Sequence, residues 1–406
     1  MSKFTDKQQK VIDHDYGNIV VSASAGSGKT SVMIERLIRL ISEGKASVRN
    51  ILAVTFTRLA AGEMREKLSR AIIKKIQQGE DVARMRKELN DLPFATISTI
   101  DSFLNTLVSK YFYLVGVDSR YQIVAESQAE ALKTLAMSEV FERLYDSDDK
   151  DLNLLMHAFI TKRSDAQLRK LILSVYTFLE SQLEPDKFLS SALSNYTQAG
   201  HEIAENRLIG QLFNQVNDIN DLLKGLQIEA LALGCAKYSD YLSQICSNVD
   251  NCEKTPAGIL QVVKAIPKKP SKQKTDTALI LDLSERISAY VKRLKKVVDD
   301  CFKYFGIDKN LRLDRTLKNK ALLQSLINVV KQFELEYAKQ KQEQNLLDYA
   351  DLARCAYKLL QNKEVIDDIK NTYKYIFVDE YQDTNGVQEG IFRLLEQNNL
   401  FIVGDV

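Results

Sequence analysis

The stretch SASAGSGKT, residues 22–30, constrains the fold of this 406-residue chain more than any other. It follows the β-rich run NIVV and precedes TSVMIERLIRLISEG, in which apolar residues recur at helical spacing. Gly26 and Gly28 permit backbone angles closed to other residues, so the chain can turn sharply from a strand into a helix. Such a turn presents backbone amides and a helix N-terminus together, which predicts a phosphate-binding loop.

The predicted loop assigns a nucleotide-binding role to consecutive residues. Lys29 is expected to reach the outer phosphates, and Thr30 to hold Mg²⁺ through its hydroxyl. Ala23 stands where such loops usually have their first glycine. A plain glycine-rich turn is the alternative, but the Gly-Lys-Thr ending between a strand and a helix favours phosphate binding. The residues predicted to bind nucleotide here are Ala23, Ser24, Ala25, Gly26, Ser27, Gly28, Lys29 and Thr30.

A second stretch, YIFVDEYQDT (375–384), supplies acidic residues after an apolar strand. Asp379 has the position of the carboxylate that organises Mg²⁺ in phosphate-loop enzymes. Glu380 has the position of a base that activates the attacking water. An acidic pair at a strand end is weak evidence alone, but a phosphate loop in the same chain makes it strong. Lys29, Asp379 and Glu380 are therefore the predicted catalytic residues, with Thr30 and Asp379 as metal ligands.

The order of the patterns along the chain predicts an interrupted α/β domain. Short apolar runs at 18–24, 51–57 and 94–100 alternate with helical patterns, and the rhythm returns at 375–380 and 400–405. Between them, apolar residues follow helical periodicity, as at 126–145, 168–179, 207–233, 279–298 and 321–340. We expect a parallel-sheet lobe formed by residues 1–109 and 346–406, interrupted by a helical insertion at 110–345.

Composition narrows the class of protein without identifying a partner. Apolar residues make up 45% and charged residues 27%, no apolar run is long enough for a membrane span, and the N-terminus lacks a signal-peptide core. Five cysteines without a CxxC pair indicate reduced thiols in a cytoplasmic protein, and three scattered histidines give no metal site. The net charge of +2 is too small to indicate nucleic-acid binding. The lysine-rich segment 265–276 is either a solvated loop or a DNA-backbone contact.

Six motifs in order resemble superfamily 1 DNA helicases of the UvrD/Rep/RecB/AddA group. They are Gln8 in FTDKQQ, the phosphate loop, AVTFTRLAAGEMREKL (53–68), ISTIDSF (97–103), VDEYQDT (378–384) and IVGD (402–405). Within the group, the long insertion between the fourth and fifth motifs is similar to AddA and RecB. LRKLILSVYTFLESQLEPDKFL (168–189) resembles an AddA helix, and NLLDYADLARCAYKLL (345–360) resembles a segment at the return to the motor, although simple packing explains the latter's periodicity equally well.

The resemblance implies an ATP- and Mg²⁺-dependent 3′→5′ DNA helicase of a RecA-like fold. It implies that Gln8 recognises adenine and that Gln382 and Asp383 couple ATP to DNA, with Gln382 in the nucleotide site. It further implies single-stranded or duplex-end DNA as substrate, no membrane, and a possible AddB/RecC-like partner subunit. The residues implied to contact DNA are Thr55, Phe56, Thr57, Thr99 and Ser102. Phe56 can stack on a base or fill the core.

Two positions depart from the group's pattern. Arg58 stands where the group usually has Asn, and Asp101 stands where it usually has His. An acid near a phosphate backbone is unfavourable, so Asp101 is expected to cap the following helix instead. A UvrD-like repair helicase and a non-hydrolysing nucleotide- or DNA-binding module are the alternatives.

The last residues, IVGD and one Val, resemble the start of a motif that continues to a glutamine in the group. The chain stops before that glutamine and before a second motor lobe. We therefore expect an N-terminal portion of a larger helicase that binds ATP on an open face. The absent lobe supplies arginines in the group, so this portion is expected to hydrolyse ATP negligibly and to bind single-stranded DNA weakly.

Overall fold

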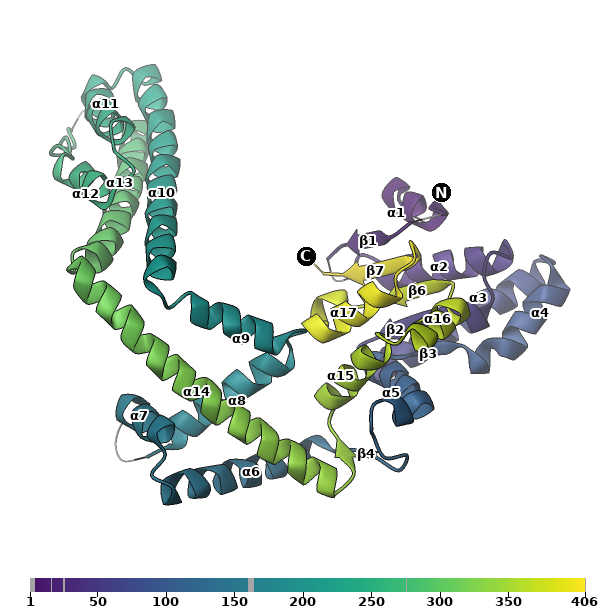
Figure 1. Cartoon of the computed structure of the whole chain (residues 1–406). Coiled ribbons are helices and arrows are strands. Elements are labelled where there is room, and N and C mark those ends of the chain that lie inside the picture. The colour runs from purple at the N-terminus through teal and green to yellow at the C-terminus, as the bar shows by residue number, and fades with distance from the viewer. Residues whose placement is uncertain (1–3, 16, 25, 160–163, 275, 406) are drawn as a thin grey trace. The chain divides into compact units, whose positions relative to one another are not determined.

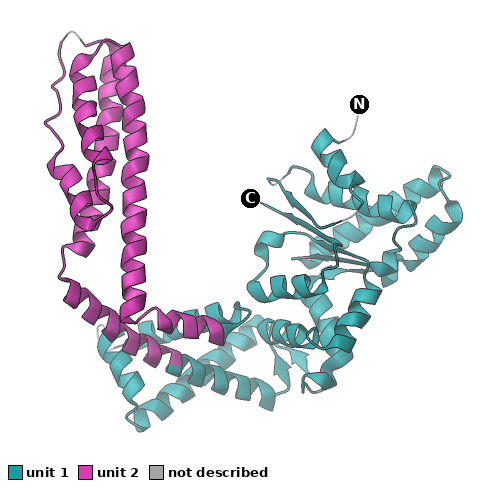
Figure 2. Cartoon of the chain, turned by 45° about the horizontal axis from the view of Figure 1, so that its top comes forward, with its two compact units in different colours: residues 1–185, 328–406 teal, residues 186–327 magenta. Residues whose placement is uncertain are grey.

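The chain forms two compact units. One contains residues 1–185 and 328–406, and the other contains residues 186–327 (Figure 2). The first unit carries the sheet and the predicted nucleotide site, and the second consists of helices. The computed structural model describes residues 4–15, 17–24, 26–159, 164–274 and 276–405.

Five parallel strands form the sheet of the first unit, in the order β1-β7-β6-β2-β3 (Figure 1). The register pairs Val21 with Val403 and Phe377 with Phe401. Strands from both ends of the sequence thus share one sheet, which confirms the predicted α/β class and the interrupted RecA-like sheet. The strands are β1 (Ile19–Ser22), β2 (Ile51–Thr55), β3 (Thr96–Thr99), β6 (Tyr375–Val378) and β7 (Leu400–Gly404).

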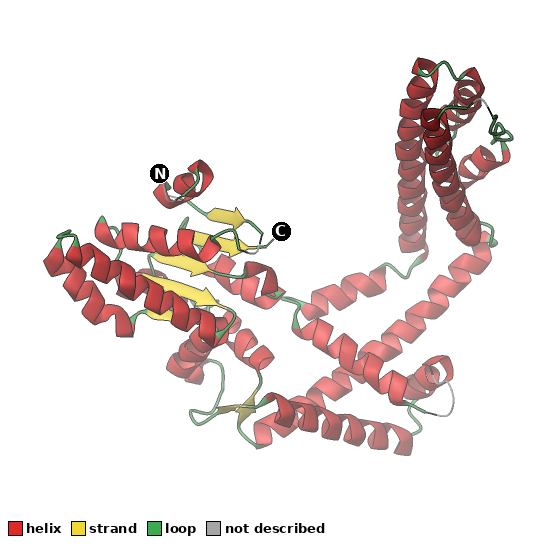
Figure 3. Ribbon diagram, turned by 180° about the vertical axis from the view of Figure 1, so that it is seen from behind, coloured by secondary structure: helices red, strands yellow, loops and turns green. Residues whose placement is uncertain are grey.

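Helices cover both faces of this sheet, which explains the continuous apolar sequences of its central strands (Figure 3). In β2, Ile51 and Ala53 pack with one set of helices, and Leu52 and Val54 with the other. The first set is α2 (Lys29–Ser42), α3 (Arg58–Gln77) and α4 (Val82–Asp91). The second set is α5 (Ile100–Tyr111), α15 (Tyr349–Leu359), α16 (Lys363–Thr372) and α17 (Gly386–Leu395).

The parallel topology brings the predicted motifs to one edge. Because all five strands run in the same direction, the segments that follow them begin at the same, carboxyl-terminal edge of the sheet. This edge is where open α/β sheets bind their ligands. It collects the phosphate loop after β1, Phe56 after β2, Asp379 after β6 and Asp405 after β7.

The rest of the first unit is almost entirely helical. It contains α1 (Asp6–Asp13), α6 (Glu126–Asp146), α7 (Lys150–Phe159), α8 (Ala166–Glu180) and the last part of α14 (Lys309–Glu343). Its two remaining strands, β4 (Gln122–Ile123) and β5 (Leu346–Leu347), pair in parallel. Among the described residues between 120 and 340, β4 is the one strand, which confirms a nearly all-helical insertion. Helices α6–α8 belong to the unit that holds the sheet, and the domain limits expected from the sequence stay a prediction.

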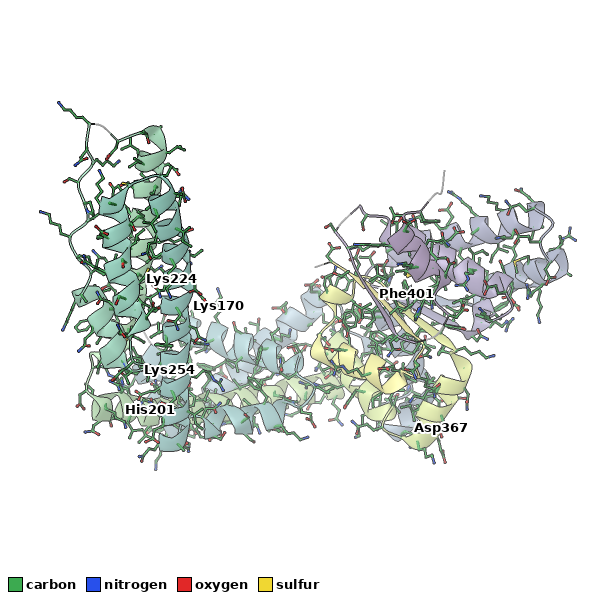
Figure 4. All side chains as sticks on the ribbon, turned by 90° about the horizontal axis from the view of Figure 1, so that it is seen from above. Lys170, His201, Lys224, Lys254, Asp367 and Phe401 are labelled. Carbon is green, nitrogen blue, oxygen red and sulfur yellow. The ribbon has the colours of Figure 1, made fainter. Side chains whose placement is uncertain are left out.

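The second unit has its own apolar core. Val216, Leu242 and Ile287 are completely buried in it. His201, on α10 (Figure 4), is 4% exposed, and its Nδ1 lies 3.0 Å from the Thr316 hydroxyl oxygen. The helices are α10 (Gln198–Ala232), α11 (Ala236–Asp250), α12 (Pro256–Lys264), α13 (Ala278–Phe305) and the first part of α14, with α9 (Pro185–Ser194) beginning one residue before the unit.

The lysine-rich segment lies between α12 and α13 and is partly tied to α13. The Lys269 ammonium donates to the Ser284 carbonyl oxygen at 2.7 Å, and Lys272 pairs with Glu285 at 3.5 Å. Across the described part of the chain, no helix is both long and apolar enough to cross a membrane. In the same residues, no group of three or more His, Cys, Asp or Glu side chains is arranged to hold a metal ion.

Candidate nucleotide-binding site

The loop between β1 and α2 has the backbone conformation that its glycines predict. Gly26 and Gly28 have φ angles of 77° and 87°, in the left-handed region that other residues rarely enter. Gly28 is the N-cap of α2 and has no side chain to accept from the first-turn N–H groups. A phosphate oxygen can accept those hydrogen bonds instead.

Backbone hydrogen bonds anchor this loop to its neighbours. The Ser27 N–H donates to the Ser24 carbonyl oxygen, and the Ala23 N–H donates to the Gly404 carbonyl oxygen, each at 3.2 Å. The second bond joins the entrance of the loop to the end of β7. Ala25, also predicted to bind nucleotide, lies outside the described residues.

Lys29, the first residue of α2, forms an ion pair with Asp405. The Lys29 side chain is 10% exposed, and that of Asp405 is 41% exposed. The ammonium is therefore held at the sheet edge by the residue that follows β7. A phosphate bound in the loop has to compete with this carboxylate for the same ammonium.

Asp379 and Glu380 follow β6 directly. Asp379 is 5% exposed, and burial raises the pKa of its carboxyl, although the Glu380 N–H donates to its Oδ1 at 3.1 Å. The ammonium groups of Lys29 and Lys67 act in the opposite direction, which places both near this carboxylate. Glu380 is half-buried and has a left-handed backbone, with φ 53° and ψ 44°. This conformation costs a non-glycine residue about 1–3 kcal/mol.

Gln382 links Glu380 to the end of β7. Its Nε2 donates to Glu380 Oε2 at 2.7 Å, and its Oε1 accepts from the Asp405 N–H at 2.9 Å. A Cβ at Gly404 would lie 2.9 Å from the same Oε1, so glycine is needed for this close approach. The Asp383 N–H donates to the Glu380 carbonyl oxygen at 3.0 Å. The arrangement joins the predicted base to Asp405 and, through its ion pair, to Lys29.

Gln8, predicted to recognise adenine, lies beside the phosphate loop. Its Nε2 donates to the Ser27 carbonyl oxygen at 3.0 Å, and its Oε1 accepts from the Thr5 N–H at 2.9 Å. The helix that carries it is fixed by Arg36 of α2, whose guanidinium donates to the Val11 carbonyl oxygen at 2.9 Å. Recognition of adenine by Gln8 thus requires an exchange of these hydrogen bonds.

Thr30 and Asp379 fit the requirements of a Mg²⁺ site. Both offer hard oxygen ligands, which this ion prefers. Asp379 has no ion pair within the described chain, and a buried carboxylate without one is stabilised when a cation binds. Thr30 follows Lys29 in the first turn of α2 and is half-buried. Few protein ligands suffice, since phosphates and water complete the shell.

The residues predicted to contact DNA after β2 differ sharply in exposure. Thr55 is completely buried and its hydroxyl has no partner in the described structure, so it does not lie on an accessible surface. Phe56 is 55% exposed, which excludes the alternative that it fills the core. Thr57 is exposed, and its hydroxyl caps α3 by accepting from the Ala60 N–H at 3.1 Å.

The expectation that Asp101 caps α5 is wrong. Thr99 is the N-cap, and its Oγ1 accepts from the Ser102 N–H at 3.2 Å and lies 2.7 Å from the Ser102 hydroxyl oxygen. Asp101 stands one residue too late, inside the first turn. Thr99 is 8% exposed, whereas Ser102 is exposed, so Ser102 is the more accessible candidate for a phosphate contact.

Three residues near the site were missed by sequence reasoning. Lys67 on α3 approaches Asp379, but one lysine on a helix rich in charge gives no distinct signal. The pairing of Asp405 with Lys29 joins residues far apart in sequence. Tyr349 is 52% exposed and lines the cavity beside Phe56. Its position in LDYADL was the available signal.

A parallel sheet with a phosphate loop after one strand and an acidic pair after another defines a P-loop nucleotide-binding protein. Within that class, the chain belongs to the UvrD/REP helicase N-terminal domain family, which it matches over residues 4–406. This match confirms the resemblance inferred from the motifs.

Similar curated proteins are named as the AddA component of an ATP-dependent helicase/nuclease, one of its subunits. That of Ligilactobacillus salivarius is 31% identical over 100% of this chain and 34% of its own length. Those of Syntrophomonas wolfei and Heliobacterium modesticaldum are 30% and 31% identical, again over 100% of this chain, and over 34% and 32% of their own lengths. The chain thus spans about a third of the length of the relatives it matches.

Proposed function

We propose that this chain is the ATP-binding motor portion of an AddA-like, ATP-dependent 3′→5′ DNA helicase in repair or recombination. The observation that carries the proposal is the convergence of Lys29, Asp379 and Glu380 at the sheet edge that also exposes Phe56. A nucleotide-binding fold alone explains the first three. The exposed ring supplies the surface for a strand.

Phosphate binding follows from the loop and its neighbouring cations. The uncapped N–H groups of α2 and the Lys29 ammonium bind the outer phosphates, and Lys67 adds positive charge on the same side. Gln8 binds adenine after leaving the Ser27 carbonyl. Thr30 and Asp379 hold Mg²⁺, which neutralises phosphate charge when bound.

Glu380 is the proposed base for hydrolysis. It orients a water and takes its proton as the water oxygen bonds to the γ-phosphorus and the bond to the ADP oxygen breaks. The Gln382 amide holds Glu380 while accepting from the Asp405 N–H. A shift of the β7 end on nucleotide binding is thereby passed to the base.

The DNA strand is proposed to pass over the neighbouring strand ends. Phe56 stacks on a base, a contact worth about 1–3 kcal/mol. The hydroxyl of Ser102 binds a backbone phosphate. Since the relatives are named as subunits, we further propose a partner of the AddB/RecC kind.

Nucleotide affinity tests the proposal through Lys29→Ala. Hydrogen bonds to charged groups contribute about 1.5–3 kcal/mol, so the variant should bind MgADP and MgATP about tenfold or more weakly in calorimetry. Lys87→Ala, at an exposed position on α4, removes the same charge elsewhere and should bind normally. Equal affinities for Lys29→Ala and Lys87→Ala would refute the phosphate loop.

Glu380→Gln separates binding from turnover. It should retain nucleotide affinity but abolish any DNA-stimulated phosphate release, measured on the protein together with whatever follows residue 406 in its gene. Release that survives in Glu380→Gln contradicts the assignment of the base. Binding without release in the whole protein supports the alternative, a non-hydrolysing nucleotide-binding module.

A further inference from the structure

A cavity of about 310 Å³ opens at the sheet edge, beside the ring of Phe56. Three segments distant in sequence contribute to it: the start of α3, the start of α5 and the start of α15. It is distinct from the phosphate loop, none of whose residues lines it. Its lining includes Phe56, Arg58, Asp101, Ser102, Asn105 and Tyr349.

Two large aromatic rings are left exposed at this cavity. Phe56 is 55% exposed and Tyr349 is 52% exposed. Neither ring is needed to fill the core at that level of exposure. Paired exposed rings around a hollow are suited to an unstacked nucleobase, because every base offers a flat face for stacking.

The polar groups of the cavity form a donor and acceptor pattern. Asp101 and Asn105 are one turn apart on α5, so they lie on the same face of the helix. Asp101 has no hydrogen bond or ion pair within the described structure, and burial raises the pKa of its carboxyl. Asn105 Oδ1 already accepts from the Tyr121 hydroxyl at 2.6 Å, which leaves the Asn105 NH₂ group as donor. The cavity thus offers two acceptor oxygens beside a donor.

We propose that this cavity holds one unstacked nucleobase of the bound strand and that Asp101 and Asn105 make it selective for guanine. The Watson–Crick edge of guanine presents two neighbouring donors, N1–H and N2–H, and one acceptor, O6. Asp101 accepts from the two donors, and the Asn105 NH₂ group donates to O6. The inference rests on the proposed DNA binding and adds a base preference to it.

The other bases match this pattern less well. Thymine presents one donor between two carbonyl oxygens, which face the Asp101 carboxylate unfavourably. Cytosine and adenine each present one amino group beside an unprotonated ring nitrogen, so Asp101 gains one hydrogen bond and meets one lone pair. The acid in place of the group's usual histidine is thereby explained by a base edge, whereas a backbone phosphate would be repelled.

Binding of labelled 20-nucleotide strands tests the inference in the 406-residue chain. Fluorescence anisotropy at one fixed salt concentration compares oligo(dT) with an alternating dT-dG strand, which offers guanine in every register. A bidentate pair discriminates by about 1–3 kcal/mol, so the dT-dG strand should bind about fivefold tighter or more. Equal affinities for the two strands overturn the base preference and leave the proposed DNA binding intact. Absence of any strand binding refutes both.

Asp101→Asn identifies the reader of the base. It should remove the preference for the dT-dG strand while binding oligo(dT) as well as the wild type, since it removes no favourable contact to thymine. Asp367→Asn, an exposed acid on α16 (Figure 4), removes the same charge elsewhere and should keep the preference. Retention of the preference by Asp101→Asn refutes the role of Asp101. Tyr349→Ala should weaken both strands, and unchanged affinity for both excludes the cavity as the base site.

Discussion

The ammonium of Lys29 is occupied by a carboxylate before any nucleotide is bound. Asp405 pairs with it at the end of β7, and Gln382 connects that same residue to Glu380. Nucleotide binding therefore exchanges one anionic partner of Lys29 for another. The exchange frees Asp405 to move, which is a physical route from the phosphates to the residues that follow β7.

Asp405→Asn should strengthen nucleotide binding. The substitution removes the competing carboxylate and keeps the size of the side chain. An ion pair of this exposure contributes about 0.2–1 kcal/mol, so the affinity for MgADP should rise by up to about fivefold in calorimetry. The gain should shrink at high salt, because screening weakens the competing pair. A loss of affinity would show that Asp405 assists the nucleotide.

At the scale of single residues, sequence predicted what is encoded locally. Lys29, Thr30, Asp379 and Glu380 were found because a loop or a strand end fixes their surroundings within a few positions. The buried position of Thr55 and the capping of α5 by Thr99 were not predicted. Both depend on packing and backbone geometry that a motif does not state.

Helix α15 is held at its start by buried charge, and this fixes the position of Tyr349. Lys341 of α14, 4% exposed, pairs with Asp348 at 2.7 Å and with Asp351 at 2.5 Å. Asp348 caps α15 by accepting from the Asp351 N–H at 2.9 Å. Buried pairs of this kind add little net stability but strongly disfavour other arrangements. The wall of the proposed base cavity is therefore rigid.

Glu180, the last residue of α8, makes the first unit sensitive to pH. Burial raises the pKa of its carboxyl, and the charge of Asp348 acts in the same direction. The Tyr176 hydroxyl and the ammonium groups of Lys133 and Lys341 oppose the shift. A raised folded-state pKa gives stability that is present below the unfolded-state pKa. That stability is lost as pH rises through the folded-state pKa.

Glu180→Gln should therefore stabilise the protein at pH 7.5 more than at pH 4.5. Removing the ionised form should raise the melting temperature at the higher pH by on the order of 2 °C, measured by calorimetry. Glu142→Gln, on the exposed surface of α6, should show no such difference between the two pH values. A lower melting temperature for Glu180→Gln at pH 7.5 would mean that its charge is stabilising.

At the scale of elements, long periodic segments were predicted and short ones were not. The helical patterns at 168–179 and 279–298 lie within α8 and α13. The strand expected at 375–380 ends at Val378, because the chain leaves the ladder to present Asp379 and Glu380. Strands β4 and β5 have two residues each. Two residues cannot show a periodic pattern.

The whole molecule contains two sets of apolar cores that do not share residues. The cores of the first unit pack helices on the two faces of the sheet, whereas the core of the second unit is built from α10 to α13. Periodicity could locate the change from mixed to helical structure. It could not locate the unit boundaries within α9 and α14, since both helices continue across them without a break in pattern.

Separate cores predict separate responses to damage. Leu242 is completely buried in the core of the second unit, and Leu104 is completely buried in that of the first. Either substitution by alanine should cost its own unit about 2–5 kcal/mol. Leu242→Ala should accelerate amide hydrogen exchange in α10–α13 but leave MgADP affinity unchanged, whereas Leu104→Ala should accelerate exchange around the sheet and weaken MgADP binding. Equal loss of nucleotide affinity in both variants would show that the units unfold together, because only a shared transition carries damage from the second core to the phosphate loop.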